Sequence, residues 1–172
     1  MSQTQVERLF IEDRTSLMHD LFRLTATVSS SSAENPTTIT SNLERADDAQ
    51  AGHLGTGMSE SSGIFTFPST GIYKITANAQ FSRNNAEILY SGIYIFATSD
   101  NFSSEDYLTS NFCSINNTAS AYAHAVTQAV YDVTDLTNNK VKFKYQSNPG
   151  FYMTADTNAN ATYFLFQKLG DT

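Results

Sequence analysis

The sequence predicts an all-β domain, an antiparallel double-sheet jelly roll, on three observations. Aromatic residues make up 12% of the chain and charged residues only 16%, a composition that suits strands and polar turns better than helices. Roughly eight to ten short segments alternate apolar and polar residues between turn signals, which is the number a jelly roll requires. The length of 172 residues is enough for one sizeable core and too short for two comfortable domains.

The first segment has a different pattern from the rest. Apolar residues between Val6 and Leu24 are spaced by three, four and seven, which predicts an amphipathic helix from about Thr15 onward, with Thr15 or Ser16 as its cap. Such a face packs either on its own domain or a neighbouring subunit, or it serves as an anchor. We interpret residues 1–21 as an N-terminal anchoring arm and residues 22–172 as the head. The candidate anchoring residues are Val6, Leu9, Phe10, Ile11, Leu17 and Leu21.

The head is expected to begin with a strand from Phe22 to Val28, where apolar side chains fall on every second residue. The polar run from Ser29 to Pro36 is predicted to be a loop. A strand, a sharp turn and a longer strand then follow within Gly63 to Phe81. In the longer strand five residues share one face, namely Tyr73, Ile75, Ala77, Ala79 and Phe81.

Further strands are predicted at Leu108 to Ile115, Ala125 to Val133 and Thr162 to Leu169. The segment Ile88 to Ala97 is apolar on both faces and should lie between two sheets or against another subunit. One thin sandwich cannot easily bury all of this apolar surface. Because burial stabilises by about 25 cal/mol per Å² of apolar surface, the remaining surface favours a trimer over a monomer. The residues expected in the core or the trimer interface are Tyr73, Tyr90, Tyr94, Phe96, Phe164 and Phe166.

The block Gly63 to Phe81, a phenylalanine strand followed by Pro-x-x-Gly-Ile-Tyr, resembles the globular heads of the complement and tumour-necrosis-factor superfamily. The aromatic strand Tyr163 to Leu169 is similar to the last strand of those heads, and the likeness spans about Phe22 to Leu169. The resemblance implies a compact jelly roll that assembles as a homotrimer. It also implies a binding or structural module rather than an enzyme.

A second resemblance concerns the opening residues 2–11, SQTQVERLFI, which are similar to the leader of phage fibre and virion structural proteins. No collagen-like stalk precedes the head, and the single cysteine excludes an intrachain disulfide. Together these features imply a non-enzymatic virion structural protein of a tailed bacteriophage, serving in capsid decoration or as a fibre component. Its partners would be other copies of itself and capsid or tail proteins, and its location the virion surface after assembly in the host cytoplasm.

Two alternatives remain open. In the first, the protein is a receptor-binding adhesin whose polar loops, Ser99 to Tyr107 and Ser147 to Asn160, bind a host-surface glycan. The possible ligand contacts are then the outward row Lys140, Lys142 and Lys144, although such lysines also protect a strand from aggregation. In the second, it is a secreted lectin-like or cytokine-like head that is glycosylated at asparagine triplets.

Charge and motifs exclude several classes of function. The net charge of −7 and the pI of about 4.7 disfavour nucleic acid and anionic membranes as partners, and no apolar run is long enough for membrane insertion. His19, His53 and His124 follow no metal-ligand spacing, and Cys113 is best interpreted as a small buried hydrophobe. Nucleophile-elbow and phosphate-loop motifs are lacking. We therefore expect no enzyme activity, no metal and no cofactor.

Overall fold

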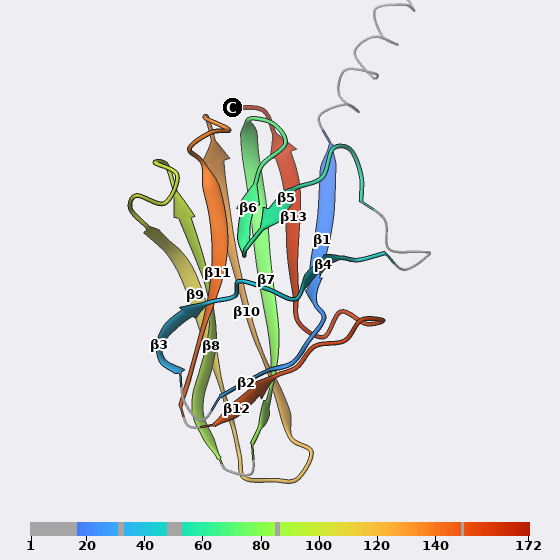
Figure 1. Ribbon diagram of the computed structural model, residues 1–172, viewed down its shortest axis with the longest axis vertical. Helices are drawn as coiled ribbons and strands as arrows, with labels where there is room; N and C mark the ends of the chain where they lie inside the picture. Colours follow the sequence, from blue (N-terminus) through green and yellow to red (C-terminus); the bar gives the residue numbers. More distant parts are fainter. Residues whose placement is uncertain (1–16, 31–32, 48–52, 85–86, 149) are drawn as a thin grey trace, which may run out of the picture.

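The computed structural model describes residues 17–30, 33–47, 53–84, 87–148 and 150–172. In this part of the chain two antiparallel sheets face each other and no helix is present, so the predicted jelly-roll class is confirmed (Figure 1). Accordingly, no helix among the described residues is long and apolar enough to cross a membrane. The two sheets enclose a single core between them.

Sheet A is the seven-stranded sheet, and sheet B is the six-stranded one. Sheet A contains β1 (Met18–Leu24), β2 (Val28–Ser30), β4 (Leu43–Arg45), β7 (Gly71–Arg83), β10 (Tyr122–Val133), β12 (Phe151–Met153) and β13 (Tyr163–Gly170). Sheet B contains β3 (Ala33–Thr38), β5 (Ser59–Ser61), β6 (Ile64–Thr66), β8 (Ile88–Thr98), β9 (Asp106–Ile115) and β11 (Lys140–Asn148). The long strand β7 is central, because it pairs with β10 on one side and with β13 and β12 on the other.

The core follows the period-two pattern of the sequence. All five residues predicted to share one face of β7 are fully buried, which confirms that prediction. Aromatic rings from both sheets meet there: Phe143 of sheet B stacks on Phe164 of sheet A with ring centroids 4.1 Å apart. Phe65 contacts Phe22 edge to face at 5.1 Å. Offset and edge-to-face contacts of this kind add to the stabilisation from area burial.

The predicted helix from Thr15 onward is wrong over the residues that the structure describes there. Met18 to Leu24 form strand β1, which pairs with β13 and β4, and the head therefore begins at least four residues before the expected boundary at Phe22. The run Ser29 to Pro36 is not simply a loop, because parts of β2 and β3 lie within it. Backbone pairing to β12 and β11 supplies the hydrogen bonds that make these polar segments strands.

An ion-pair network fixes β1 against β4 and the segment before β5. Asp20 is fully buried, and Arg45 donates to its two carboxylate oxygens from Nε and Nη2 at 2.8 and 3.0 Å. The backbone N–H of Met58 donates to the same carboxylate at 2.7 Å. The hydrogen bond with Asp20 raises the pKa of Arg45 above its ordinary value, against a smaller lowering by burial. A Cβ on Gly57 would lie 2.5 Å from the Asp20 Oδ2 atom, so a larger residue here would displace the carboxylate from its ion pair.

Candidate binding surfaces

The described residues hold no group of three or more His, Cys, Asp or Glu side chains that could bind a metal. His124 is committed to two side-chain contacts, with Asn78 and Gln80. Burial raises the pKa of the Cys113 thiol to about 11, which keeps it protonated and unreactive near neutral pH.

Three of the residues predicted for the core or the trimer interface lie in the core. Tyr73, Phe164 and Phe166 are fully buried between the sheets, and the Tyr73 hydroxyl donates to the Ser69 carbonyl at 3.0 Å. The other three, Tyr90, Tyr94 and Phe96, lie half-buried on the outward face of β8. Their role in contact with a second copy stays a prediction.

The outward face of sheet B carries an aromatic patch, which we define as Tyr90, Tyr94, Phe96, Tyr107 and Phe112. Phe112 of β9 meets Tyr94 edge to face at 5.5 Å. A Cβ on Gly92 would lie 2.5 Å from the Phe112 ring, so glycine is what lets this ring lie across β8. The apolar outer face of β8 is thus covered in part by aromatic rings of the same chain. The sequence pattern had predicted that a second sheet or another subunit would cover it.

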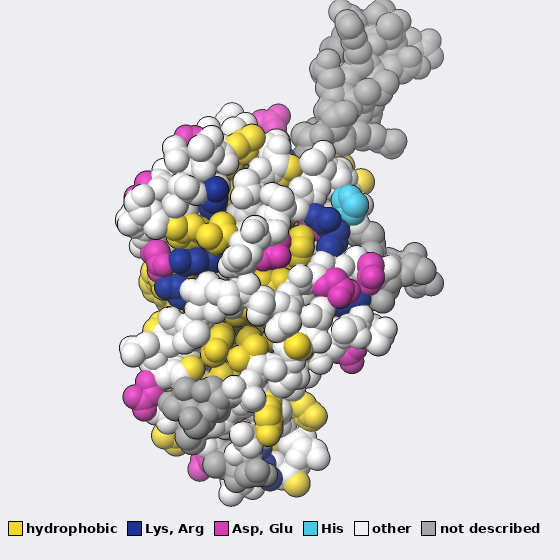
Figure 2. Space-filling view, viewed as in Figure 1, with side chains coloured by type: hydrophobic (Ala, Val, Ile, Leu, Met, Phe, Trp, Pro, Cys, Tyr) yellow, Lys and Arg dark blue, Asp and Glu magenta, His cyan; other side chains and the backbone are white. Residues whose placement is uncertain are grey.

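The row Lys140, Lys142 and Lys144 points outward from β11, as the alternation predicted. Lys142 and Lys144 both donate to Glu105, and their ammonium groups lie 4.2 and 4.4 Å from the ring centroids of Phe102 and Phe96. Figure 2 shows such basic, acidic and hydrophobic side chains gathered on this face. Burial acts to raise the pKa of Glu105, but hydrogen bonds and charge from the two lysines outweigh it and hold that pKa below its ordinary value. These lysines are engaged within the chain.

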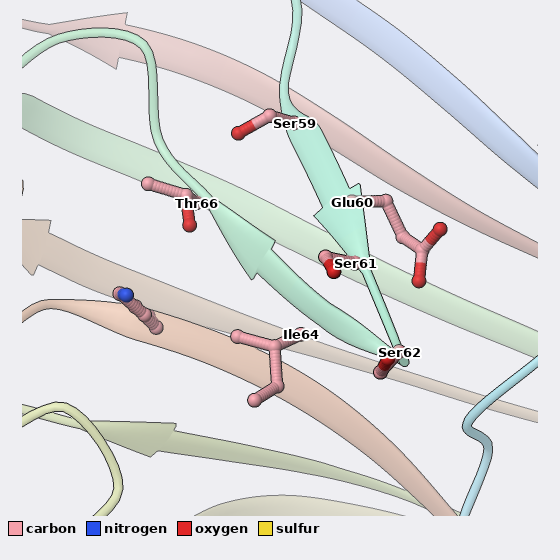
Figure 3. A pocket seen from close by; sticks show the side chains of 7 residues that line it. Ser59, Glu60, Ser61, Ser62, Ile64 and Thr66 are labelled. Atoms are coloured by element: carbon pink, nitrogen blue, oxygen red, sulfur yellow. The ribbon is translucent and has the colours of Figure 1, made fainter.

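Lys140 lines a shallow depression of about 390 Å³ beside the β5–β6 hairpin. Figure 3 shows Ser59, Ser61 and Ser62 on this hairpin, with Glu60 extending away from Ile64 and Thr66. The Glu60 carboxylate accepts a hydrogen bond from the backbone of Gly63 at 2.7 Å, so it supports the turn. The depression is open to solvent, and Glu60 and Lys140 are its two charged lining residues.

The outward face of sheet A, which we call the sheet A face, carries exposed and half-buried apolar residues among polar and charged ones. Its apolar residues come from three strands that pair directly or through β7: Leu21, Val126, Val130, Tyr163 and Leu165. Thr76 and Asn78 lie between them on β7, and Lys74, Gln128 and Asp132 point to the same side. Val130 is 64% exposed, which is a large exposure for a branched apolar side chain in the middle of a strand.

The predicted anchoring residues divide into two groups. Val6, Leu9, Phe10 and Ile11 lie outside the described residues. Leu17 lies just before β1 and is exposed, as is Leu54, whose own backbone exchanges two hydrogen bonds with the backbone of His19. Leu21 is half-buried and belongs to the sheet A face. Their role in anchoring stays a prediction.

No family model matches the chain, and no curated protein matches it. Solved structures do. Murine APRIL at pH 5.0 is similar with a TM-score of 0.62 and 14% identity, covering 89% of this chain and 99% of that one. Eiger TNF from S. frugiperda is similar with a TM-score of 0.64 and 10% identity, covering 91% of this chain and 95% of that one. At these identities the likeness shows the fold alone, a jelly roll of the tumour-necrosis-factor type.

Proposed function

We propose that this protein is a non-enzymatic, homotrimeric surface module of a tailed-bacteriophage virion, attached to the capsid or tail by its N-terminal residues. The observation that carries the trimer is the sheet A face, where apolar side chains from β1, β10 and β13 lie exposed or half-buried. Three subunits packed through the part of this face that carries Leu21, Val130 and Leu165 would remove those side chains from water and leave the end of the face at Tyr122 exposed. The resemblance to heads that assemble in threes supports the same stoichiometry.

The attachment is supported by the direction of the chain. The described part starts next to β1 at one end of the sandwich, and the loop that joins β9 to β10 lies at the other end (Figure 1). Residues 1–16 are therefore joined to the head at the end opposite that loop. The resemblance of residues 2–11 to virion leaders supports their use as the attachment, with the opposite end displayed.

Substitution on the sheet A face tests the trimer. Val130→Asp should convert the protein to monomers in light scattering, because a carboxylate would be desolvated in the subunit contact. Leu136→Asp is the matched control, since Leu136 is also exposed but lies in the turn after β10. A Val130→Asp protein that keeps the wild-type mass would contradict the use of this face.

Deletion of residues 1–16 tests the attachment, because the described sandwich begins after them. The shortened chain should still form a trimer and give the circular dichroism spectrum of a folded head. It should be missing from purified particles when it replaces the full chain during assembly. Full incorporation of the shortened chain would refute attachment by this segment. Absence of the full-length protein from particles, measured by mass spectrometry, would refute the virion role itself.

A further inference from the structure

Two shallow depressions lie at the displayed end of the sheet A face and share one wall, Tyr122. Their volumes are about 330 and 310 Å³, at the lower end of the range for small-ligand sites. The Tyr122 side chain is 60% exposed, more than the other exposed aromatic side chains of the described residues, Tyr107 and Phe112. We call the two depressions and the ring between them the Tyr122 groove.

Strand register places a second tyrosine opposite the first. Ser82 of β7 pairs with Tyr122 of β10 on one side and with Tyr152 of β12 on the other. Residues paired in this way point to the same face, and two strand spacings separate the tyrosines by roughly 10 Å. The larger depression lies here, lined by Ser82 and both tyrosines and by Arg83 and residues 119–121.

The groups around this depression are held in place before any ligand arrives. The Tyr152 hydroxyl donates to Asn84 Oδ1 at 3.0 Å. Arg83 donates from Nε to the Thr118 carbonyl and from Nη1 to Asn117, each at 2.7 Å, which ties the β9–β10 loop to β7. A guanidinium and a Tyr152 ring that are already held in place reduce the entropy cost of binding.

The next row toward the sheet centre is a chain of polar side chains. Thr154 Oγ1 donates to Gln80 Oε1 at 2.6 Å, which leaves Gln80 Nε2 to donate to His124 Nε2 at 3.1 Å. His124 then carries its proton on Nδ1 and donates it to Asn78 Oδ1 at 3.2 Å. The smaller depression lies beside this row, lined by Gln80, Thr154 and Asp156 among others.

We propose that the Tyr122 groove binds a neutral oligosaccharide. An exposed tyrosine ring offers a flat apolar surface to the C–H face of a sugar, and the surrounding amide, hydroxyl, carboxylate and guanidinium groups match sugar hydroxyls as donors and acceptors. One arginine and one aspartate line the groove, so its charges balance and favour an uncharged ligand. The openness of both depressions suits a chain of sugars better than a compact apolar molecule. This inference rests on the proposed function, because attachment through the N-terminal residues leaves this end free to meet a cell surface.

The test uses the full-length protein on an array of defined oligosaccharides, followed by saturation-transfer NMR with each sugar that binds. Tyr122→Ala should weaken binding about tenfold or more, as expected for loss of a central aromatic contact. Asp156→Ala, in the wall of the smaller depression, should also weaken binding and is an exposed change that leaves the core intact. Tyr107→Ala is the matched control, because Tyr107 is 57% exposed but lies in the aromatic patch of sheet B.

Each outcome decides the proposal. Loss of binding in Tyr122→Ala and Asp156→Ala, with wild-type mass and binding kept in Tyr107→Ala, supports it. Loss in Tyr107→Ala instead would move the site to sheet B and overturn it, as would preference for an acidic peptide or the absence of any sugar binding at millimolar concentration. Because mass and particle incorporation are measured on the same proteins, a failure of sugar binding is distinguishable from a failure of the trimer or of the attachment.

Discussion

The buried ion pair between Asp20 and Arg45 should be asymmetric in its contribution to stability. Asp20 is fully buried, whereas 38% of the Arg45 side chain is exposed. Replacing Arg45 by Met leaves a buried carboxylate with one remaining donor, the backbone N–H of Met58, and an orphaned buried charge costs about 3–5 kcal/mol. Asp20→Asn keeps the shape and an acceptor, and the arginine still reaches water, so the expected loss is about 1.5–3 kcal/mol.

Urea unfolding followed by far-ultraviolet circular dichroism measures both losses, at one fixed subunit concentration because assembly adds to apparent stability. The double variant should lose at least 1 kcal/mol less than the two single losses added together, since one interaction connects the two residues. Arg83→Met is the control: it removes hydrogen bonds to a carbonyl and an amide but orphans no carboxylate, and should cost about 1 kcal/mol. An Arg45→Met loss no larger than that of Asp20→Asn would refute the reasoning.

Three further predictions follow from the outward face of sheet B and its loops. Gly92→Ala should destabilise the fold by about 1–3 kcal/mol in the same urea assay, because the new methyl group pushes against the Phe112 ring, and the loss should be smaller when Phe112 is also replaced by Ala. Gly170→Ala is the control and should be nearly neutral, because a Cβ there meets nothing within 4 Å. The pKa of Glu105 is lowered in the folded state, so its ion pairs add at most about 1 kcal/mol to the free energy of unfolding at neutral pH, and this stabilisation is lost as the pH falls below the ordinary value of 4.5. The stability difference between the wild type and Glu105→Gln should therefore shrink over that pH range, and a constant difference would count against the ion pairs. Hydrogen bonds from neighbouring serine and threonine hydroxyls lower the pKa of Asp100 to about 2, so its carboxyl carbon resonance in an NMR titration should stay that of the ionised form at pH 4, where a half-protonated signal would be inconsistent with those bonds.

The sequence could predict the central strands because one buried face imposes a period of two. Residues 71–81 show that pattern cleanly, and the structure buries the predicted face of β7 completely. The same alternation predicted the outward row Lys140, Lys142 and Lys144, and the structure buries Val141 and Phe143 between them. The alternation within such a segment is enough to predict a strand.

The start of the head could not be predicted in the same way. β1 buries Met18, Asp20, Phe22 and Leu24 on one face, but the aspartate interrupts the apolar alternation, and the remaining residues fit a helical spacing. The partner that makes this aspartate a core residue is Arg45, 25 positions further along. Side chains that are buried because of distant partners leave no local pattern in the sequence.

Polar strands and surface sites could not be predicted from the sequence for a related reason, because both depend on pairing with distant strands. Strand β3 reads AENPTT and is held by pairing with β11, so no apolar periodicity marks it. The Tyr122 groove depends on the register that sets Tyr122 and Tyr152 on opposite sides of Ser82, which only the folded sheet reveals. Of the predicted site residues, the structure places Tyr73, Phe164 and Phe166 in the core.

The molar mass of the full-length protein in solution tests the central claim most directly. Light scattering after size exclusion, at micromolar subunit concentration, should give three times the 18.9 kDa mass of one chain. A mass of one chain at that concentration would show that the sheet A face remains in water, and would contradict a trimeric head.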